Sequence, residues 1–184
     1  MKKILIILGI VLGVVVIGGL IFIGQFKTRA LPDYNRDIKL AGLNAEVTVI
    51  RDSFAIPHIY AENEHDLYLA VGYAMAQDRL WQMDLLRRVT QGRLAEIFGK
   101  DLVDADMLFR ALRFTEKSRR VFSKTDRNAQ ICLESFADGV NQFIKQAGKK
   151  LPPEFGLLGY KPEPWLPEHS LNLIGYMAWD LSTG

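Results

Sequence analysis

The sequence predicts an α+β protein that is mostly helical and is preceded by a transmembrane helix. Apolar residues recur at helical spacing over long segments, chiefly 64–91 and 126–147, whereas only two short runs, 45–52 and 56–63, have the composition of strands. A third observation is the apolar run at the N-terminus. The 184-residue chain can hold one domain with its own core, and its length equally fits a fragment of a larger protein.

Composition excludes some classes of function. The net charge is +2, from 23 basic and 21 acidic residues spread along the chain, and no segment combines a basic face with aromatic residues. Nucleic-acid binding is therefore not expected. The single cysteine, Cys132, excludes an internal disulfide framework.

The N-terminus predicts a membrane segment. Residues 4–23 contain no charged or polar side chain, and as a helix they are about long enough to cross ~30 Å of hydrocarbon. Residues 28–30 fit a signal-peptide cleavage site poorly. We therefore expect residues 1–26 to be a transmembrane anchor or uncleaved signal of an extracytoplasmic, membrane-anchored or exported protein. Residues 27–44, which contain proline and glycine, are expected to be a linker.

A β-hairpin is predicted next. Residues 45–52 alternate and are β-branched, residues 56–63 form a second short apolar run, and the stretch 52–55 between them is predicted to be the turn. Pro57 suits the start of a strand or an edge, because its nitrogen cannot donate a ladder hydrogen bond.

A long helix is predicted to follow the hairpin. Asn63, three residues before Asp66, is typical of an N-cap, and Gly92 can adopt the left-handed conformation that ends a helix. Gly72 in the helix interior costs about 1 kcal/mol relative to alanine and indicates close approach of another element. The apolar stripe that should face the core consists of Leu67, Ala70, Val71, Ala74, Trp81, Leu85 and Val89.

Asp78 lies on that same stripe, beside Arg79. An unpaired buried carboxylate is costly, so Asp78 is expected to be paired, for instance with an arginine from another element, or to face a polar junction. A catalytic acid is the alternative. No convergent histidine, cysteine or second carboxylate accompanies Asp78, which favours an organising ion pair.

Three helices are predicted in the middle of the chain. A short one within 92–100 is closed by Gly99, a second covers 104–123, and a clearer one covers 126–147. The last of these carries an almost unbroken apolar stripe and is ended by Gly148.

The C-terminal part is predicted to be an ordered loop and a final helix. Residues 151–170 are too rich in proline for a regular element and too apolar for a flexible linker, so they are expected to dock through Phe155, Leu157, Leu158, Tyr160 and Trp165. The final helix begins near 167–170, and its apolar stripe consists of Leu171, Ile174, Met177, Ala178 and Leu181.

Local motifs predict neither a catalytic residue nor a metal site in this chain. His58, His65 and His169 lack the spacing of metal ligands. Phosphate-binding loops, the G-x-S-x-G elbow and kinase signatures are absent from the sequence. Ser182 and Thr183 have no base or oxyanion donor near them in the sequence.

Three stretches carry a family resemblance. Residues 49–100 contain an R-D-x-x-G-x-P-H-I-x-A-like strand pair, then A-Q-D-R-L-x-Q-M, then Q-G-x-x-A-E. Residues 158–171, "LGYKPEPWLPEHSL", and 175–181, "GYMAWDL", complete the pattern. Together they resemble the penicillin acylase (penicillin amidase) family of N-terminal nucleophile hydrolases. The match departs at Ala55, where glycine is usual, and this affects only the local turn.

The resemblance implies the N-terminal, α-chain portion of a four-layered α-β-β-α fold, with residues 45–184 as an incomplete acylase domain. In that family a precursor cuts itself, and the catalytic serine begins the larger, downstream β-chain. The implied substrate-binding residues are Met177, Leu181 and Asp180; packing of the core is the alternative for Met177 and Leu181. Asp78, Arg79 and Trp165 are implied to be structural. No cofactor is implied, although a structural calcium is possible in the complete enzyme.

The expected function is hydrolysis of the amide bond of N-acyl compounds, such as β-lactam antibiotics or acyl-homoserine lactones, once the downstream chain supplies the serine. This chain alone should be inactive. The alternative is a non-catalytic, membrane-tethered helical fragment that acts as a binding module.

Overall fold

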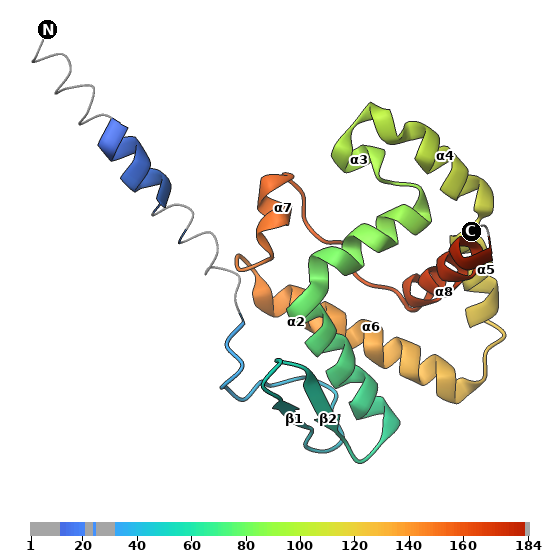
Figure 1. The fold of residues 1–184 in the computed structure, drawn as a ribbon. Coiled ribbons are helices and arrows are strands. Elements are labelled where there is room, and N and C mark those ends of the chain that lie inside the picture. Colours follow the sequence, from blue (N-terminus) through green and yellow to red (C-terminus); the bar gives the residue numbers. More distant parts are fainter. Residues whose placement is uncertain (1–11, 21–23, 25–31, 183–184) are drawn as a thin grey trace, which may run out of the picture.

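The computed structural model describes residues 12–20, 24 and 32–182. Residues 12–20 are helical, and no helix among the described residues is long and apolar enough to cross a membrane. Much of the predicted membrane segment, residues 4–23, lies outside the described residues. From residue 48 onward the chain forms a hairpin and then a group of helices (Figure 1).

The predicted hairpin is present, with shorter strands than expected. β1 (Thr48–Arg51) pairs antiparallel with β2 (Pro57–Tyr60), and Val49 lies opposite Ile59. Pro57 is the first residue of its strand, as predicted. Ala55 in the turn has a φ of 61°, in the left-handed region that favours glycine.

The long helix α2 (Glu64–Gln91) begins and ends as predicted. The side chain of Asn63 accepts a hydrogen bond from the Asp66 N–H, and Gly92 takes the left-handed conformation with a φ of 62°. At Arg79 the backbone leaves the helical region, with φ −142° and ψ 22°, so that α2 is kinked there.

The predicted core stripe of α2 is confirmed only in part: Ala70 and Ala74 are buried as predicted, but most of the stripe is not. The buried face includes Leu69, Ala76, Leu80 and Met83, whereas Trp81, Leu85 and Val89 are only partly buried. Two physical causes explain the error. The kink changes the direction of the helix, and charged side chains occupy part of the buried face beyond it, so that apolar spacing alone locates the wrong positions.

α2 packs most extensively against α6 (Arg127–Ala147), and both Gly72 and Gly139 lie at their contact. A Cβ at Gly72 would lie 2.1 Å from the Phe136 carbonyl oxygen, and one at Gly139 would lie 2.0 Å from the Leu69 carbonyl oxygen. The backbones therefore touch, which confirms the close approach predicted at Gly72. The core at this contact consists of Ala76, Leu80, Met83, Ala137, Val140, Phe155 and Trp165.

The region after α2 contains more breaks than predicted. α3 (Ala95–Phe98) and η1 (Lys100–Leu102) lead into α4 (Val103–Leu112) and α5 (Phe114–Phe122). The single helix predicted over 104–123 is wrong, because Arg113 adopts a left-handed conformation with a φ of 56° between α4 and α5.

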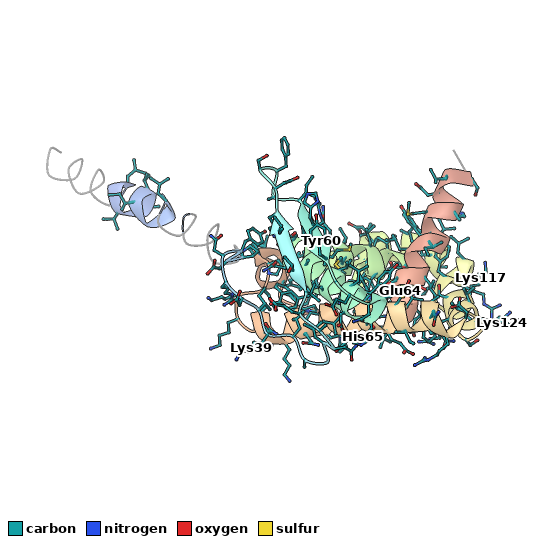
Figure 2. The ribbon with its side chains drawn as sticks, turned by 90° about the horizontal axis from the view of Figure 1, so that it is seen from below. Lys39, Tyr60, Glu64, His65, Lys117 and Lys124 are labelled. Carbon is teal, nitrogen blue, oxygen red and sulfur yellow. The ribbon has the colours of Figure 1, made fainter. Side chains whose placement is uncertain are left out.

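The proline-rich loop docks on the core through buried Phe155 and Trp165, as predicted. The loop also contains a short helix, α7 (Pro153–Leu157), where no regular element was expected, and Leu157 is exposed. The chain continues into α8 (Pro167–Ser182), which packs mainly on α5. Figure 2 shows the hairpin and the C-terminal half of α8 projecting from the same side of the helical layer.

Candidate functional site

The apolar stripe predicted on α8 faces outward. Ile174, Met177 and Leu181 are 63%, 53% and 80% exposed. The residues of α8 that are buried are His169 and Asn172, and a Cβ at Gly175 would lie 3.1 Å from the ring of Phe114 in α5. Met177 and Leu181 therefore do not pack into the core formed by the described residues, which was the alternative to a place in the acyl pocket, because α8 uses a different face to contact α5.

The implied substrate-binding residues thus lie together on an uncovered helix surface. Met177 and Leu181 are one helical turn apart, and Asp180 is also exposed. Large exposed apolar side chains at helical spacing are typical of a surface that contacts another protein or a ligand. We call Ile174, Met177 and Leu181 the α8 face.

An apolar groove lies between α2 and α8. It has a volume of about 230 Å³. Most of its wall is apolar, and Arg79, Gln82, Arg87, Thr90, His169 and Ser170 contribute polar atoms. The apolar lining of this α2–α8 groove consists of Met75, Met83, Leu86, Phe136, Trp165 and Leu173.

Trp165 holds the floor of the groove in place. Its indole Nε1–H donates to the Ser170 hydroxyl at 3.1 Å, and its backbone N–H donates to the Asn141 side chain at 2.7 Å. The Asn141 amide in turn donates to the Trp165 carbonyl oxygen at 2.9 Å. These bonds satisfy the polar atoms of a buried tryptophan and fix its ring.

His169 is buried beside Trp165, and its ring is not arranged as a catalytic base. Its Nδ1 accepts the Leu166 N–H at 3.0 Å, and its Nε2 lies 3.1 Å from the Gln91 side-chain amide. Burial, with the nearby Arg87, lowers the pKa of His169 to about 4, so the ring is neutral at pH 7. The adjacent Ser170 hydroxyl binds Trp165 rather than this imidazole.

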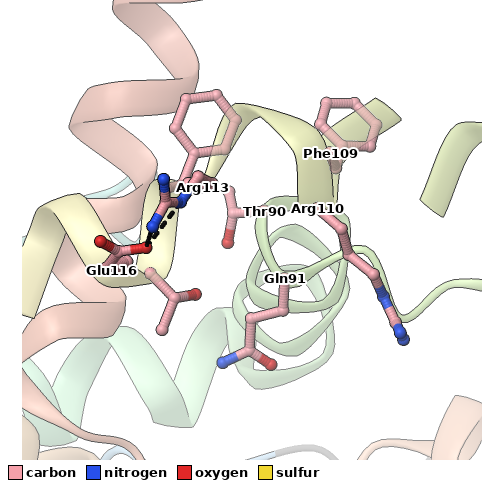
Figure 3. Close-up of a pocket in the computed structure, with 8 residues that line it drawn as sticks. Thr90, Gln91, Phe109, Arg110, Arg113 and Glu116 are labelled. Carbon is pink, nitrogen blue, oxygen red and sulfur yellow. Dashed lines mark hydrogen bonds and ion pairs between the residues drawn. The ribbon is translucent and has the colours of Figure 1, made fainter. Parts of the chain in front are cut away.

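A second pocket, of about 230 Å³, opens between the end of α2 and the junction of α4 and α5 (Figure 3). Its guanidinium groups already have partners. Arg113 pairs with Glu116, and Arg110 donates to the Gly92 carbonyl oxygen at 2.8 Å. The ion pair lines the pocket, and the other lining side chains include Thr90, Gln91 and Phe109. The arrangement offers polar contacts but no nucleophile with an adjacent base.

Asp78 is held by the hairpin rather than by its neighbour Arg79. The guanidinium of Arg51, in β1, donates to the two carboxylate oxygens at 2.8 and 3.1 Å. The Asp78 side chain is 22% exposed, and Tyr34 also donates to it at 2.9 Å. Arg79 donates to Gln82 at 3.0 Å instead. A carboxylate that accepts three hydrogen bonds from the hairpin and from Tyr34 is suited to organising structure.

The charged cluster at the end of α2 was not predicted from the sequence. Asp84 is buried and accepts hydrogen bonds from both Arg87 and Arg88, one helical turn later. Arg93 binds Glu163 of the docked loop at 2.7 and 2.9 Å and lowers the pKa of that carboxyl to about 2. The i, i+3 and i, i+4 spacing of Asp84 to the two arginines was the available signal. The cluster joins α2 to the loop.

The described part of the chain contains no group of three or more histidine, cysteine, aspartate or glutamate residues that could hold a metal ion. The geometry therefore consists of an apolar groove, an exposed apolar helix face and fixed ion pairs. These features can bind and position apolar groups.

Comparison with known proteins places this arrangement in a family. Residues 46–184 match the family model described as penicillin amidase. The chain is 45% identical over 145 residues to "Penicillin acylase 2 proenzyme" of Pseudomonas sp. (strain SE83), covering 79% of this chain and 19% of that protein. It is 34% identical to "Penicillin G acylase" of Escherichia coli, covering 73% of this chain and 16% of that protein. It is also 37% identical to "Acyl-homoserine lactone acylase QuiP" of Pseudomonas fluorescens (strain Pf0-1), covering 71% of this chain and 16% of that protein.

A solved structure is similar as well. The structure titled "Thermostable Penicillin G acylase from Alcaligenes faecalis in tetragonal form" matches with a TM-score of 0.70 and 32% identity, covering 76% of this chain and 75% of that chain. The present chain spans less than a fifth of the curated relatives but three quarters of the solved chain. These matches bear out the family resemblance seen in the sequence motifs. The chain belongs to the penicillin amidase family and corresponds to its N-terminal portion.

Proposed function

We propose that this chain is the N-terminal portion of an acylase-type amide hydrolase and that a downstream chain supplies the nucleophilic serine. The observation that carries the proposal is the α8 face, three large apolar side chains left uncovered on a helix that is otherwise docked. In a soluble protein such a surface is normally covered by a partner or a ligand.

The lengths of the relatives support a division into two chains. The matched segment is 19% of one curated relative and 16% of the other two, whereas the solved chain is about as long as the present one. One of the relatives is named a proenzyme. We therefore expect the complete precursor to be cut, leaving this portion associated with the larger chain.

The hairpin supports the same interpretation. It is a sheet of two strands, and Val49, Ile50, Ile56 and Tyr60 are exposed large apolar residues on or beside it. Isolated hairpins are marginally stable in water and usually need further strands or a packed face. We propose that strands of the downstream chain extend this sheet into the layered core of the family.

For the substrate, we propose N-acyl compounds with an apolar acyl group. The relatives are named penicillin acylases and acyl-homoserine lactone acylases, and both names refer to an acyl group. Met177 and Leu181 would contribute apolar wall to the acyl pocket, and Asp180 would lie at its edge. We also propose that residues 4–23 tether the protein to a membrane, because no charged side chain interrupts that run. The location outside the cytoplasm is proposed from the acylase function rather than from this run.

The proposal is tested by expressing this chain together with the downstream part of its reading frame. We expect mass spectrometry to find a larger product that begins with serine, and we expect the two-chain protein to hydrolyse acyl-nitroanilides. The 184-residue chain alone should release no nitroaniline. Turnover by the isolated chain would contradict the placement of the nucleophile, and an uncut, inactive product would favour the non-catalytic binding fragment.

A further inference from the structure

The segment before the hairpin is held to the domain by specific contacts. We call residues 33–45 the strap; it ends immediately before residue 46, where the match to the family model begins. The Asn44 and Ala45 N–H groups both donate to the buried Asp66 carboxylate, at 3.0 and 2.9 Å. Although burial opposes it, these and other hydrogen bonds hold the pKa of Asp66 well below its usual range.

The middle of the strap is bound by α6. The Gln142 side chain accepts the Ala41 N–H at 2.8 Å and donates to the Ala41 carbonyl oxygen at 2.9 Å, pairing both backbone groups of one strap residue. One turn later, Gln146 donates to the Lys39 carbonyl oxygen at 3.1 Å. The same Gln146 accepts the Tyr73 hydroxyl of α2 at 3.0 Å, so this contact ties the strap to both helices.

The start of the strap is bound at the hairpin and at α2. The Tyr34 hydroxyl donates to Asp78 at 2.9 Å, and the Arg51 guanidinium lies 3.9 Å from the centre of the Tyr34 ring. The same guanidinium donates to Asp78, to Gln77 at 3.1 Å and to the Ala55 carbonyl oxygen at 2.9 Å. One arginine thus joins the strap, the hairpin turn and α2.

This junction lies immediately before the kink of α2. Asp78 precedes Arg79, the residue with non-helical backbone angles. The part of α2 after the kink carries Met83 and Leu86, which line the α2–α8 groove together with Arg79 itself. A cavity of about 680 Å³ separates the strap from parts of the hairpin and α2, so the strap is held by its end and middle contacts rather than by continuous packing.

We propose that the strap acts as one unit that sets the position of the hairpin on α2 and fixes the kink at Arg79, and with it the α2–α8 groove. Undoing its contact with α6 then loosens the hairpin and the kink, although Gln142 has no hydrogen bond to either of them. Any part of the protein that is joined to the N-terminal end of the strap is thereby coupled to the α2–α8 groove. This inference does not depend on the proposed catalytic role.

Hydrogen exchange of the full chain, read by mass spectrometry, tests the proposal with a matched pair of variants. Gln142→Ala removes two hydrogen bonds to the strap and one to Asp138. Gln130→Ala, elsewhere on α6, removes two hydrogen bonds to the Phe122 and Thr125 carbonyl oxygens and one from Arg127. We expect Gln142→Ala to speed exchange about tenfold at residues 38–46 and also at 48–60 and 75–82. Gln130→Ala should leave those three segments unchanged.

Tyr34→Phe approaches the strap from its other end, because it removes only the hydroxyl that binds Asp78. We expect this variant to speed hydrogen exchange at residues 38–46 as well as at 75–82. Tyr68→Phe, which changes an exposed tyrosine of α2, is the control. Faster exchange confined to the residues next to each substitution would overturn the proposal, as would unchanged exchange in both strap variants.

Discussion

The buried imidazole of His169 should make the stability of the fold depend on pH. Burial, with the nearby Arg87, lowers its pKa from 6.5 to about 4. Below pH 6.5 the unfolded chain binds a proton at this histidine that the folded chain does not bind. The free energy of unfolding therefore has its highest value above pH 6.5 and falls as the pH drops toward 4. Between pH 7 and pH 5 the loss amounts to about 2 kcal/mol.

Urea unfolding at pH 7 and pH 5, followed by tryptophan fluorescence, measures this loss. His169→Asn places an amide oxygen near the position of Nδ1, where it can still accept the Leu166 N–H, but it cannot titrate. We expect this variant to lose most of the pH dependence. His58→Asn, at an exposed histidine of the hairpin, should keep it. If His169→Asn retained the full difference between the two pH values, the reasoning from burial would be refuted.

Three further predictions concern single substitutions. Ala55→Gly should raise the free energy of unfolding by about 1 kcal/mol, because Ala55 has a left-handed backbone; urea titration would show it, and a loss of stability would contradict it. Gly139→Ala should lower it by about 2 kcal/mol or more through the clash with α2, whereas Gly156→Ala, with open space around it, should be neutral or mildly stabilising. In the complete enzyme, Met177→Trp should shift the preferred acyl group toward shorter chains in a kcat/KM series, with Leu157→Trp as the exposed control; equal profiles would remove Met177 from the pocket.

Features fixed by local chemistry were the ones that could be predicted. Asn63 and Gly92 bound α2 because capping depends on a few adjacent residues. The close contact at Gly72 was predictable because an interior helix glycine has a cost that only packing explains. The family motifs depend on residue order in the same way, and they led to the family that the comparisons support.

Features set by tertiary context could not be predicted. The break at Arg113 has no glycine or proline to mark it, since a non-glycine residue takes the left-handed conformation there. The buried face of α2 includes Asp84 and Arg87, which pair with each other, and apolar spacing cannot identify such a face. Apolar spacing predicted which residues form the stripe on α8. Whether other parts of the chain cover that stripe depends on which face of α8 contacts α5.

We infer that the α8 face is covered by a downstream chain that brings the nucleophile. Oxidative footprinting of methionines, combined with an acyl-nitroanilide assay, tests it most directly, because Met177 is exposed and Met83 is buried within this chain. In the isolated chain we expect rapid oxidation of Met177, slow oxidation of Met83 and no amide hydrolysis. In the two-chain protein we expect Met177 to be protected and hydrolysis to occur. Equal reactivity of Met177 in both preparations, or hydrolysis by the isolated chain, would contradict the account.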